Sequence, residues 1–321
     1  MIKILYYSVI AILLFLTISC TNHSKETIKI GIVTWPGFCS AMVGQEKGFF
    51  GNLKIEQKIL DDSEARHAAF QSGTVDIMIS SLDVFAQEYA QGIKGQILLI
   101  TDESCGSDGM VVSDKINTAF DLKGKNIAFA RATPSQFLLY KVLQESGLTF
   151  DSIKQTVVND PSLAAQAFLG NSVDAAVTWE PFLSEVKEKK KGKILVTSRD
   201  FPDVIIDVLV CSDKFSKNPD LIKEFITDWL KSVDYIKNNP EEASKIISKG
   251  LNVKGEDIKG MMTGLKYADK QTNQRLFKTK KIDQVFESAF NFWKSQGIIN
   301  KNVELKHSIN KTASDFFNST E

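Results

Sequence analysis

Polar and aromatic residues stand directly after predicted strands, where side chains of this kind can bind a small molecule. Trp35 follows the first strand, and its ring offers a flat apolar wall or a face for a cation. Ser80 and Ser81 precede a helix, so their hydroxyls and the following amides can hold an anion or a polar group. Thr133 and Ser135 stand in the same way further along the chain. The structural alternatives are core packing for Trp35 and helix capping for the hydroxyls.

Acidic residues are concentrated near other strand ends. The segment from Asp102 to Asp108 follows one strand, and Trp179 and Glu180 end another. Carboxylates buried around an anion are electrostatically costly, so Asp102, Asp108 and Glu180 favour a cationic or zwitterionic ligand, such as an amine or a heterocycle. The alternative is that the two aspartates cap turns in solvent and that Glu180 begins a helix.

No motif in the sequence indicates catalysis, a metal or a nucleic acid. His23, His67 and His307 lie far apart along the chain, and no cysteine spacing matches a zinc site. The sequence contains neither a nucleophile elbow nor a Walker glycine loop. The 39 Lys and Arg residues balance 39 Asp and Glu residues, which leaves no excess of positive charge for a nucleic acid. We therefore expect no catalytic residue, no metal, no cofactor and no nucleic-acid partner.

Strands and helices alternate from Ile28 to Val210, which predicts an α/β fold of doubly wound sheets flanked by helices. A first series of strands is expected at 28–34, 53–60, 75–80, 96–101 and 109–113. A second series is expected at 125–130, 155–158, 173–178 and 194–197, followed by a returning strand at 205–210. Beyond residue 218 the pattern is almost entirely helical.

The two series of strands predict two lobes. The strand at 109–113 leaves the first lobe and the strand at 205–210 returns to it, and these two crossing strands form the predicted hinge. Lobe 1 should therefore comprise 28–113 and 205–321, and lobe 2 should comprise 114–204. In open α/β sheets ligands bind beyond the carboxyl ends of the strands, so the residues named above should face a cleft between the lobes.

The amino terminus predicts export and lipidation. Residues 1–19 combine one early positive charge, a short apolar run and a small residue before Cys20. The apolar run is shorter than the roughly 20 residues that span a membrane. We expect Cys20 to carry a lipid and residues 20–27 to form a tether, although Thr17 replaces the aliphatic residue that is usual three positions before such a cysteine. The alternatives are an ordinary signal peptide and a short anchor helix.

The other cysteines are not clearly paired by the sequence. Cys39 and Cys105 each follow a predicted strand, so an exported protein can join them in a disulfide. With Cys211 they make an odd number, and three free, mostly buried thiols are the favoured reading.

Five short motifs occur in order along the chain: Trp35–Phe38, Glu46–Phe50, Ala69–Ile77, Asp121–Ala128 and Ala167–Phe182. In order and spacing they resemble the substrate-binding lipoproteins of ABC importers, in the family that binds nitrate, sulfonates, taurine and thiamine-pyrimidine precursors. The first two motifs resemble the opening strand and short helix of that family, and the third resembles its Ala-x-x-x-Gly-x-x-Asp element. The last motif matches the family most fully.

This resemblance implies a type II periplasmic-binding-protein fold whose lobes close around a small molecule. It also implies an extracytoplasmic, membrane-anchored monomer whose partners are an ABC permease and its ATPase. Two alternatives stay open. One is a sensor lipoprotein that does not serve transport, and the other is an enzyme on the same fold, as in thiamine-pyrimidine synthesis.

Overall fold

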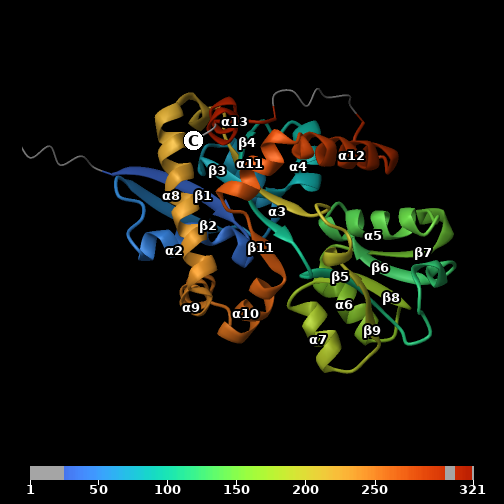
Figure 1. Ribbon diagram of the computed structural model, residues 1–321. Helices are drawn as coiled ribbons and strands as arrows, with labels where there is room; N and C mark the ends of the chain where they lie inside the picture. Colours follow the sequence, from blue (N-terminus) through green and yellow to red (C-terminus); the bar gives the residue numbers. More distant parts are fainter. Residues whose placement is uncertain (1–24, 301–307, 320–321) are drawn as a thin grey trace, which may run out of the picture.

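The computed structural model describes residues 25–300 and 308–319, which form two β-sheets in two lobes (Figure 1). The predicted signal peptide, Cys20 and residues 20–24 of the predicted tether lie outside the described residues. None of the helices within the described ranges is long and apolar enough to cross a membrane.

The first sheet has six strands in the order β11-β4-β10-β3-β1-β2. Strands β1, β2 and β3 are parallel, whereas β10 runs antiparallel to β3 and β4. The central strands β3, β4 and β10 are buried almost throughout, which explains why most of their sequence is a continuous apolar run rather than an alternating one. The strands are β1 (Glu26–Ile32), β2 (Leu53–Ile59), β3 (Ile77–Ser81), β4 (Gln96–Ser104), β10 (Ile206–Cys211) and β11 (Leu265–Tyr267).

The second sheet has five strands in the order β7-β6-β8-β5-β9. Strand β5 runs antiparallel to both β8 and β9, so residues 108–112 pair within the second sheet. The sequence analysis had placed this strand at the end of lobe 1, because periodicity shows that a strand exists but not which strands it pairs with. The exact lobe boundaries stay a prediction. The strands are β5 (Asp108–Val112), β6 (Asn126–Ala130), β7 (Lys154–Val158), β8 (Ala175–Trp179) and β9 (Lys193–Thr197).

The chain passes between the two sheets through two short segments. Residues 105–107 join β4 to β5, and residues 198–205 join β9 to β10. We call them the outward and return crossovers. Both leave one sheet and enter the other within a few residues, so the polar residues at these strand ends are held close to the boundary between the lobes.

Side-chain caps and prolines set where several helices begin. Asn218 begins the helix at 219–238 by accepting a hydrogen bond from the Leu221 amide at 3.2 Å. Asp160 begins the helix at 161–169 in the same way, by accepting from the Ser162 amide at 2.7 Å. Proline occupies the first turn of α5, α6, α8 and α9, where its missing N–H costs nothing. The second-lobe helices are α5 (Pro134–Glu145), α6 (Pro161–Leu169) and α7 (Phe182–Glu188). The others are α2 (Ser40–Glu46), α3 (Ser63–Gln71), α4 (Leu82–Ala90), α8 (Pro219–Asn238), α9 (Pro240–Leu251), α10 (Gly255–Thr263), α11 (Lys270–Lys278), α12 (Lys281–Ser295) and α13 (Lys311–Asn318).

Helix α12 packs against helices of both lobes (Figure 1). On the first-lobe side, the Trp293 indole N–H donates to the Asp83 carbonyl oxygen of α4 at 2.7 Å. On the second-lobe side, the Phe292 ring stacks on Tyr140 of α5 with centroids 4.3 Å apart and planes at 20°. The C-terminal helices, which the sequence analysis assigned to lobe 1, therefore also contact lobe 2.

We expect Phe292→Ala to lower the free energy of unfolding by about 3 kcal/mol or more, because its ring is only 2% exposed and its loss leaves a cavity between α12 and α5. Urea unfolding followed by tryptophan fluorescence measures this change. The matched control is Phe120→Ala at a ring that is 62% exposed, which should change stability by less than about 0.5 kcal/mol. Equal losses in the two variants would contradict a structural role for this contact.

Candidate functional site

A row of polar side chains crosses one face of the first sheet. Asp207 of β10 lies opposite Ser81 of β3 on one side and opposite Asp102 of β4 on the other. Asp102 in turn lies opposite Tyr267 of β11. Residues directly opposite one another on neighbouring strands share a face of the sheet, with Cβ atoms about 5 Å apart. The register therefore places two aspartates side by side between a serine and a tyrosine.

Asp102 is fully buried and only partly hydrogen-bonded. Its Oδ2 accepts from the Thr101 hydroxyl at 2.9 Å, and a Cβ at Gly37 would lie 2.0 Å from the same oxygen, so a larger residue there would displace the carboxylate. Its Oδ1 has no hydrogen-bond partner among the described residues. The Trp35 indole N–H lies beside the carboxylate and favours its charged form, yet no hydrogen bond of ordinary geometry joins them. The structure thus places Trp35 beside Asp102, and their role in binding stays a prediction.

Asp83 adds a third buried carboxylate. It stands in the first turn of α4, two residues after Ser81, and its side chain is fully buried. Neither of its carboxylate oxygens has a hydrogen-bond partner of ordinary geometry in the described part of the chain. The Trp293 hydrogen bond to the Asp83 carbonyl instead fixes the backbone of this turn.

Asp108 begins β5 and ties the two crossovers together. Its Oδ2 accepts from the Ser104 hydroxyl at 2.6 Å, and the Ser104 and Ser198 hydroxyl oxygens lie 2.8 Å apart. The Ser198 hydroxyl oxygen also accepts from the Gly106 amide at 2.8 Å. Across the second sheet, Asp108 lies opposite Trp179. The outward and return crossovers are therefore hydrogen-bonded to each other. At this point Asp108 of the second sheet lies near Asp102 and Asp207 of the first.

These carboxylates have no cation in contact. Within the described residues, no Lys, Arg or His nitrogen lies within 4.0 Å of a carboxylate oxygen of Asp83, Asp102, Asp108 or Asp207. Burying a charge without a partner strongly favours its neutral form. We call these four residues the aspartate cluster.

Burial is the largest cause of the raised pKa values in the aspartate cluster. It raises the pKa of Asp83 and of Asp102 to about 7, and that of Asp108 to about 6. The pKa of Asp207 lies well above its ordinary value, because burial acts together with the negative charges of the other three aspartates. The nearby charge of Glu180 raises the pKa of Asp108 further.

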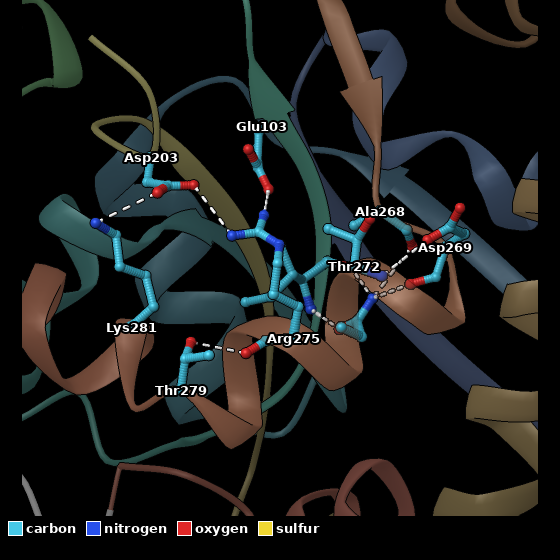
Figure 2. A network of polar contacts seen from close by, with 10 residues as sticks. Glu103, Asp203, Ala268, Asp269, Thr272, Arg275, Thr279 and Lys281 are labelled. Atoms are coloured by element: carbon cyan, nitrogen blue, oxygen red, sulfur yellow. Dashed lines mark hydrogen bonds and ion pairs between the residues drawn. The ribbon is translucent and has the colours of Figure 1, made fainter.

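The opposite face of β4 is electrostatically balanced (Figure 2). Glu103 follows Asp102 and points to the other face, as successive strand residues do. There its carboxylate lies 2.7 Å from Arg275 of α11, which also lies 3.6 Å from Asp203 on the return crossover. Lys281 of α12 lies 3.3 Å from Asp203. The cations near the hinge thus anchor the return crossover to the C-terminal helices and leave the aspartate cluster unpaired.

The remaining predicted site residues differ in what they contact. The Ser80 hydroxyl points away from the row and donates to Glu88 at 2.7 Å. The Thr133 hydroxyl donates to the Ala130 carbonyl at 2.9 Å, which holds the turn before α5. Ser135 is fully buried, and its hydroxyl has no partner among the described residues.

Glu180 has a local partner and also faces the cluster. Its carboxylate accepts from the Ser184 amide and hydroxyl, both at 3.0 Å, which stabilises the first turn of α7. This is the helix-start role that the sequence left open. Its amide donates to the Ser107 carbonyl at 2.8 Å, so it also holds the outward crossover. Trp179 is half-buried beside it.

Sequence reasoning missed Asp83, Asp207 and Tyr267. Asp207 carried a usable signal, because it is the one charged residue in the otherwise apolar run 205–210. Asp83 resembles the acidic residues that commonly begin helices, and so it did not stand out. Tyr267 belongs to a three-residue strand in a region that was expected to be helical.

The three cysteines in the described residues are free thiols, in agreement with the favoured reading of the sequence. The Cys39 thiol donates to the Trp35 carbonyl at 3.3 Å, and burial raises its pKa. Cys105 lies on the outward crossover, where its carbonyl accepts from the Arg199 guanidinium at 3.2 Å. Neither cysteine is bonded to the other.

Comparison with known proteins identifies the family. Residues 35–243 match the model of the family described as NMT1/THI5 like. A "Putative binding protein" of Brucella abortus is 29% identical over 189 residues, which are 57% of this chain and 58% of that protein. The chain thus matches little more than half the length of this relative. A "Putative aliphatic sulfonates-binding protein" of Bacillus subtilis is 26% identical over 310 residues, covering 86% of this chain and 90% of the relative.

The crystal structure of the periplasmic aliphatic sulphonate binding protein from Escherichia coli superposes with a TM-score of 0.75 at 17% identity. The match covers 90% of this chain and 99% of that one. At this identity the likeness shows the fold alone. It confirms the two-lobed periplasmic-binding-protein fold that the sequence predicted.

We expect the melting temperature of the ligand-free protein to fall by roughly 5 °C between pH 5 and pH 8. The pKa values of Asp83, Asp102 and Asp108 in the folded protein lie above the ordinary 3.8, so the folded state holds more protons than the unfolded state. Their contribution to stability is complete below about pH 4 and is lost as the pH rises through 6 to 7. Cys39 and Tyr267 face Asp102 but stay neutral over this range, because burial raises their pKa values as well.

Differential scanning fluorimetry across this pH range measures the effect. Asp102→Asn should remove part of the slope, because the amide mimics the protonated carboxyl group. Asp234→Asn, on the exposed face of α8, is the control and should leave the slope unchanged. A melting temperature that rises with pH by the same amount in all three proteins would show that the buried carboxylates are charged and compensated.

Proposed function

The chain belongs to the NMT1/THI5-like family, and we propose that it is the extracytoplasmic substrate-binding component of an ABC import system. It captures a small molecule between its two lobes and passes it to a permease that is driven by an ATPase. The observation that carries this proposal is the arrangement at the crossovers. Asp102 and Asp207 come from the first sheet, Asp108 and Trp179 come from the second, and all lie where the chain passes between the lobes.

A hinge motion gives the ligand access to this site. The aspartate cluster is buried in the structure, so the lobes must part before a small molecule can reach it. Away from the crossovers, the Gln87 amide of α4 donates to the Ala132 carbonyl before α5 at 2.8 Å. This hydrogen bond joins the two lobes and should form only when they are closed. Closure is favoured by a ligand only if some contacts form in the closed state alone.

Ligand binding at this site involves Trp35, Ser81, Asp102, Asp108, Trp179 and Glu180 in our proposal, with Asp83 and Asp207 added. Ser80 and Thr133 contribute by supporting the segments before α4 and α5, because both hydroxyls have local partners. Ser135 belongs to the second-lobe side of the same site, since its buried hydroxyl is free to take a partner. The relatives are described as binding proteins, and in our proposal this chain likewise binds its ligand without converting it.

Membrane attachment through a lipid on Cys20 completes the proposal. Residues 1–19 direct export, and the lipid and tether keep the monomeric binding protein near its permease. The support comes from the sequence pattern before Cys20. A lipid-held protein samples a small volume near the membrane, which raises its effective concentration at the permease.

A thermal-shift screen tests the binding function. We expect at least one compound among taurine, alkanesulfonates, nitrate, aminopyrimidines, polyamines and quaternary amines to raise the melting temperature by several degrees. A ligand at about a thousand times its Kd contributes roughly 4 kcal/mol of stability. The same compound should bind with one-to-one stoichiometry in calorimetry. No shift with any compound, together with no copurifying small molecule by native mass spectrometry, would contradict the function.

Metabolic labelling with a palmitate analogue in a bacterial host tests the anchor. Wild-type protein should be labelled and should sediment with membranes, whereas Cys20→Ala should be unlabelled and stay in the soluble extract. Cys105→Ser is the control and should keep the label, because that thiol lies within the folded domain. Labelling that survives Cys20→Ala would rule out this cysteine as the lipid site.

A further inference from the structure

Three buried carboxylate oxygens beside the crossovers lack a hydrogen-bond donor. They are both oxygens of Asp83 and the Oδ1 of Asp102, and both side chains have 0% exposure. A buried acceptor without a partner destabilises the folded protein, and more so when it is charged. Native proteins contain few such atoms, so two residues of this kind whose charges both act on Asp207 call for an explanation. Donors lie nearby in the described part of the chain, namely Trp35 for Asp102 and Ser81 with the first α4 amides for Asp83, but none makes a hydrogen bond of ordinary geometry to these oxygens.

The charge around these oxygens is of one sign. The charge of Asp108 raises the pKa values of Asp83 and Asp102, and all three aspartates raise the pKa of Asp207. The charge of Glu180 in turn raises the pKa of Asp108. A bound anion would add to this repulsion, whereas a bound cation would relieve it. The Trp35 ring stands beside Asp102 and can cover the apolar part of a ligand or face its charge.

We propose that Asp83 and Asp102 accept hydrogen bonds from the N–H groups of an organic cation, an ammonium, amidinium or guanidinium group. This inference rests on the proposed function, because it names the class of ligand for the same site. Asp108 and Asp207 supply further negative charge, and Glu180 extends it toward the second lobe. The ligand therefore differs in charge from the aliphatic sulfonates after which the Bacillus subtilis and Escherichia coli relatives are described.

The unpartnered oxygens distinguish among cations. A quaternary ammonium group has no N–H and would leave all three oxygens without a donor. A bare metal ion needs several ligands that converge on one point, and within the described ranges no three His, Cys, Asp or Glu side chains do so. An ammonium or guanidinium group carries several N–H donors and so fits the three open acceptor positions.

Ligands of matched size and different charge test this inference. Calorimetry at pH 7.5 would compare putrescine, agmatine and benzamidine with choline, ethanesulfonate, nitrate and calcium ion. We expect at least one N–H cation to bind, and we expect its N-permethylated form to bind at least tenfold more weakly. Asp102→Asn and Asp83→Asn should each weaken the cation by at least tenfold, whereas Asp234→Asn should not change it.

The outcomes separate this inference from the proposed function. Binding of ethanesulfonate or nitrate, with no N–H cation bound, overturns the inference and leaves the transport function standing. Binding of calcium alone, lost in Asp102→Asn, also overturns it. Equal affinities of an N–H cation for wild type, Asp102→Asn and Asp83→Asn place the ligand elsewhere and overturn it as well. If no compound of either charge binds, both this inference and the proposed binding function are contradicted. Melting curves of both variants at pH 6 check that they are folded.

Discussion

The burial of several aspartates without a countercharge is the constraint on which the centre of this protein depends. Removing a carboxylate from water costs several kcal/mol unless a partner replaces the lost hydration. Asp102 and Asp207 face each other across neighbouring strands, and Asp83 and Asp108 add to the same field. Raised pKa values mean that protons on the cluster can meet this cost in the ligand-free protein, and a bound cation could take the place of those protons.

The carboxylates on the two faces of β4 differ in whether they are paired with a cation. On one face, Glu103, Arg275 and Asp203 form ion pairs that attach the return crossover to α11. On the other face, among the residues that the structure describes, Asp102 has no cation within 4.0 Å and one oxygen without a hydrogen-bond partner. Asp102 and Glu103 are adjacent on β4 and point to opposite faces. Ion pairs therefore hold the hinge on one face of the strand, and the other face is available to a ligand.

Much of the fold could be predicted from the sequence, because the local periodicity of apolar residues indicates the order of strands and helices. Pairing between strands is not local, and this is why the strand predicted at 109–113 was placed at the end of lobe 1, whereas β5 pairs within the second sheet. The same limit applies to the site. Asp102 and Asp108 follow visible strand ends, whereas Asp207 joins them only through its register with β3 and β4.

Two adjacent serines illustrate the limit of sequence-based prediction at the site. Ser81 lies on the face of the aspartates, while Ser80 points to the other face and bonds to Glu88. A sequence pattern places the end of a strand only to within a few residues, which is too coarse to tell one from the other. Their positions become clear only when the register across the sheet is known.

Carbon-13 NMR of the aspartate side-chain carboxyl groups tests the central claim most directly. Spectra of the ligand-free protein between pH 3 and pH 9, assigned with single Asp→Asn variants, report the protonation of each residue. We predict that Asp83 and Asp102 titrate near pH 7 and Asp108 near pH 6, and that the pKa of Asp207 lies well above its ordinary value. If all of these carboxyl groups titrate below pH 4.5, the cluster is charged and compensated in the folded protein, and its preference for a cation has no physical basis.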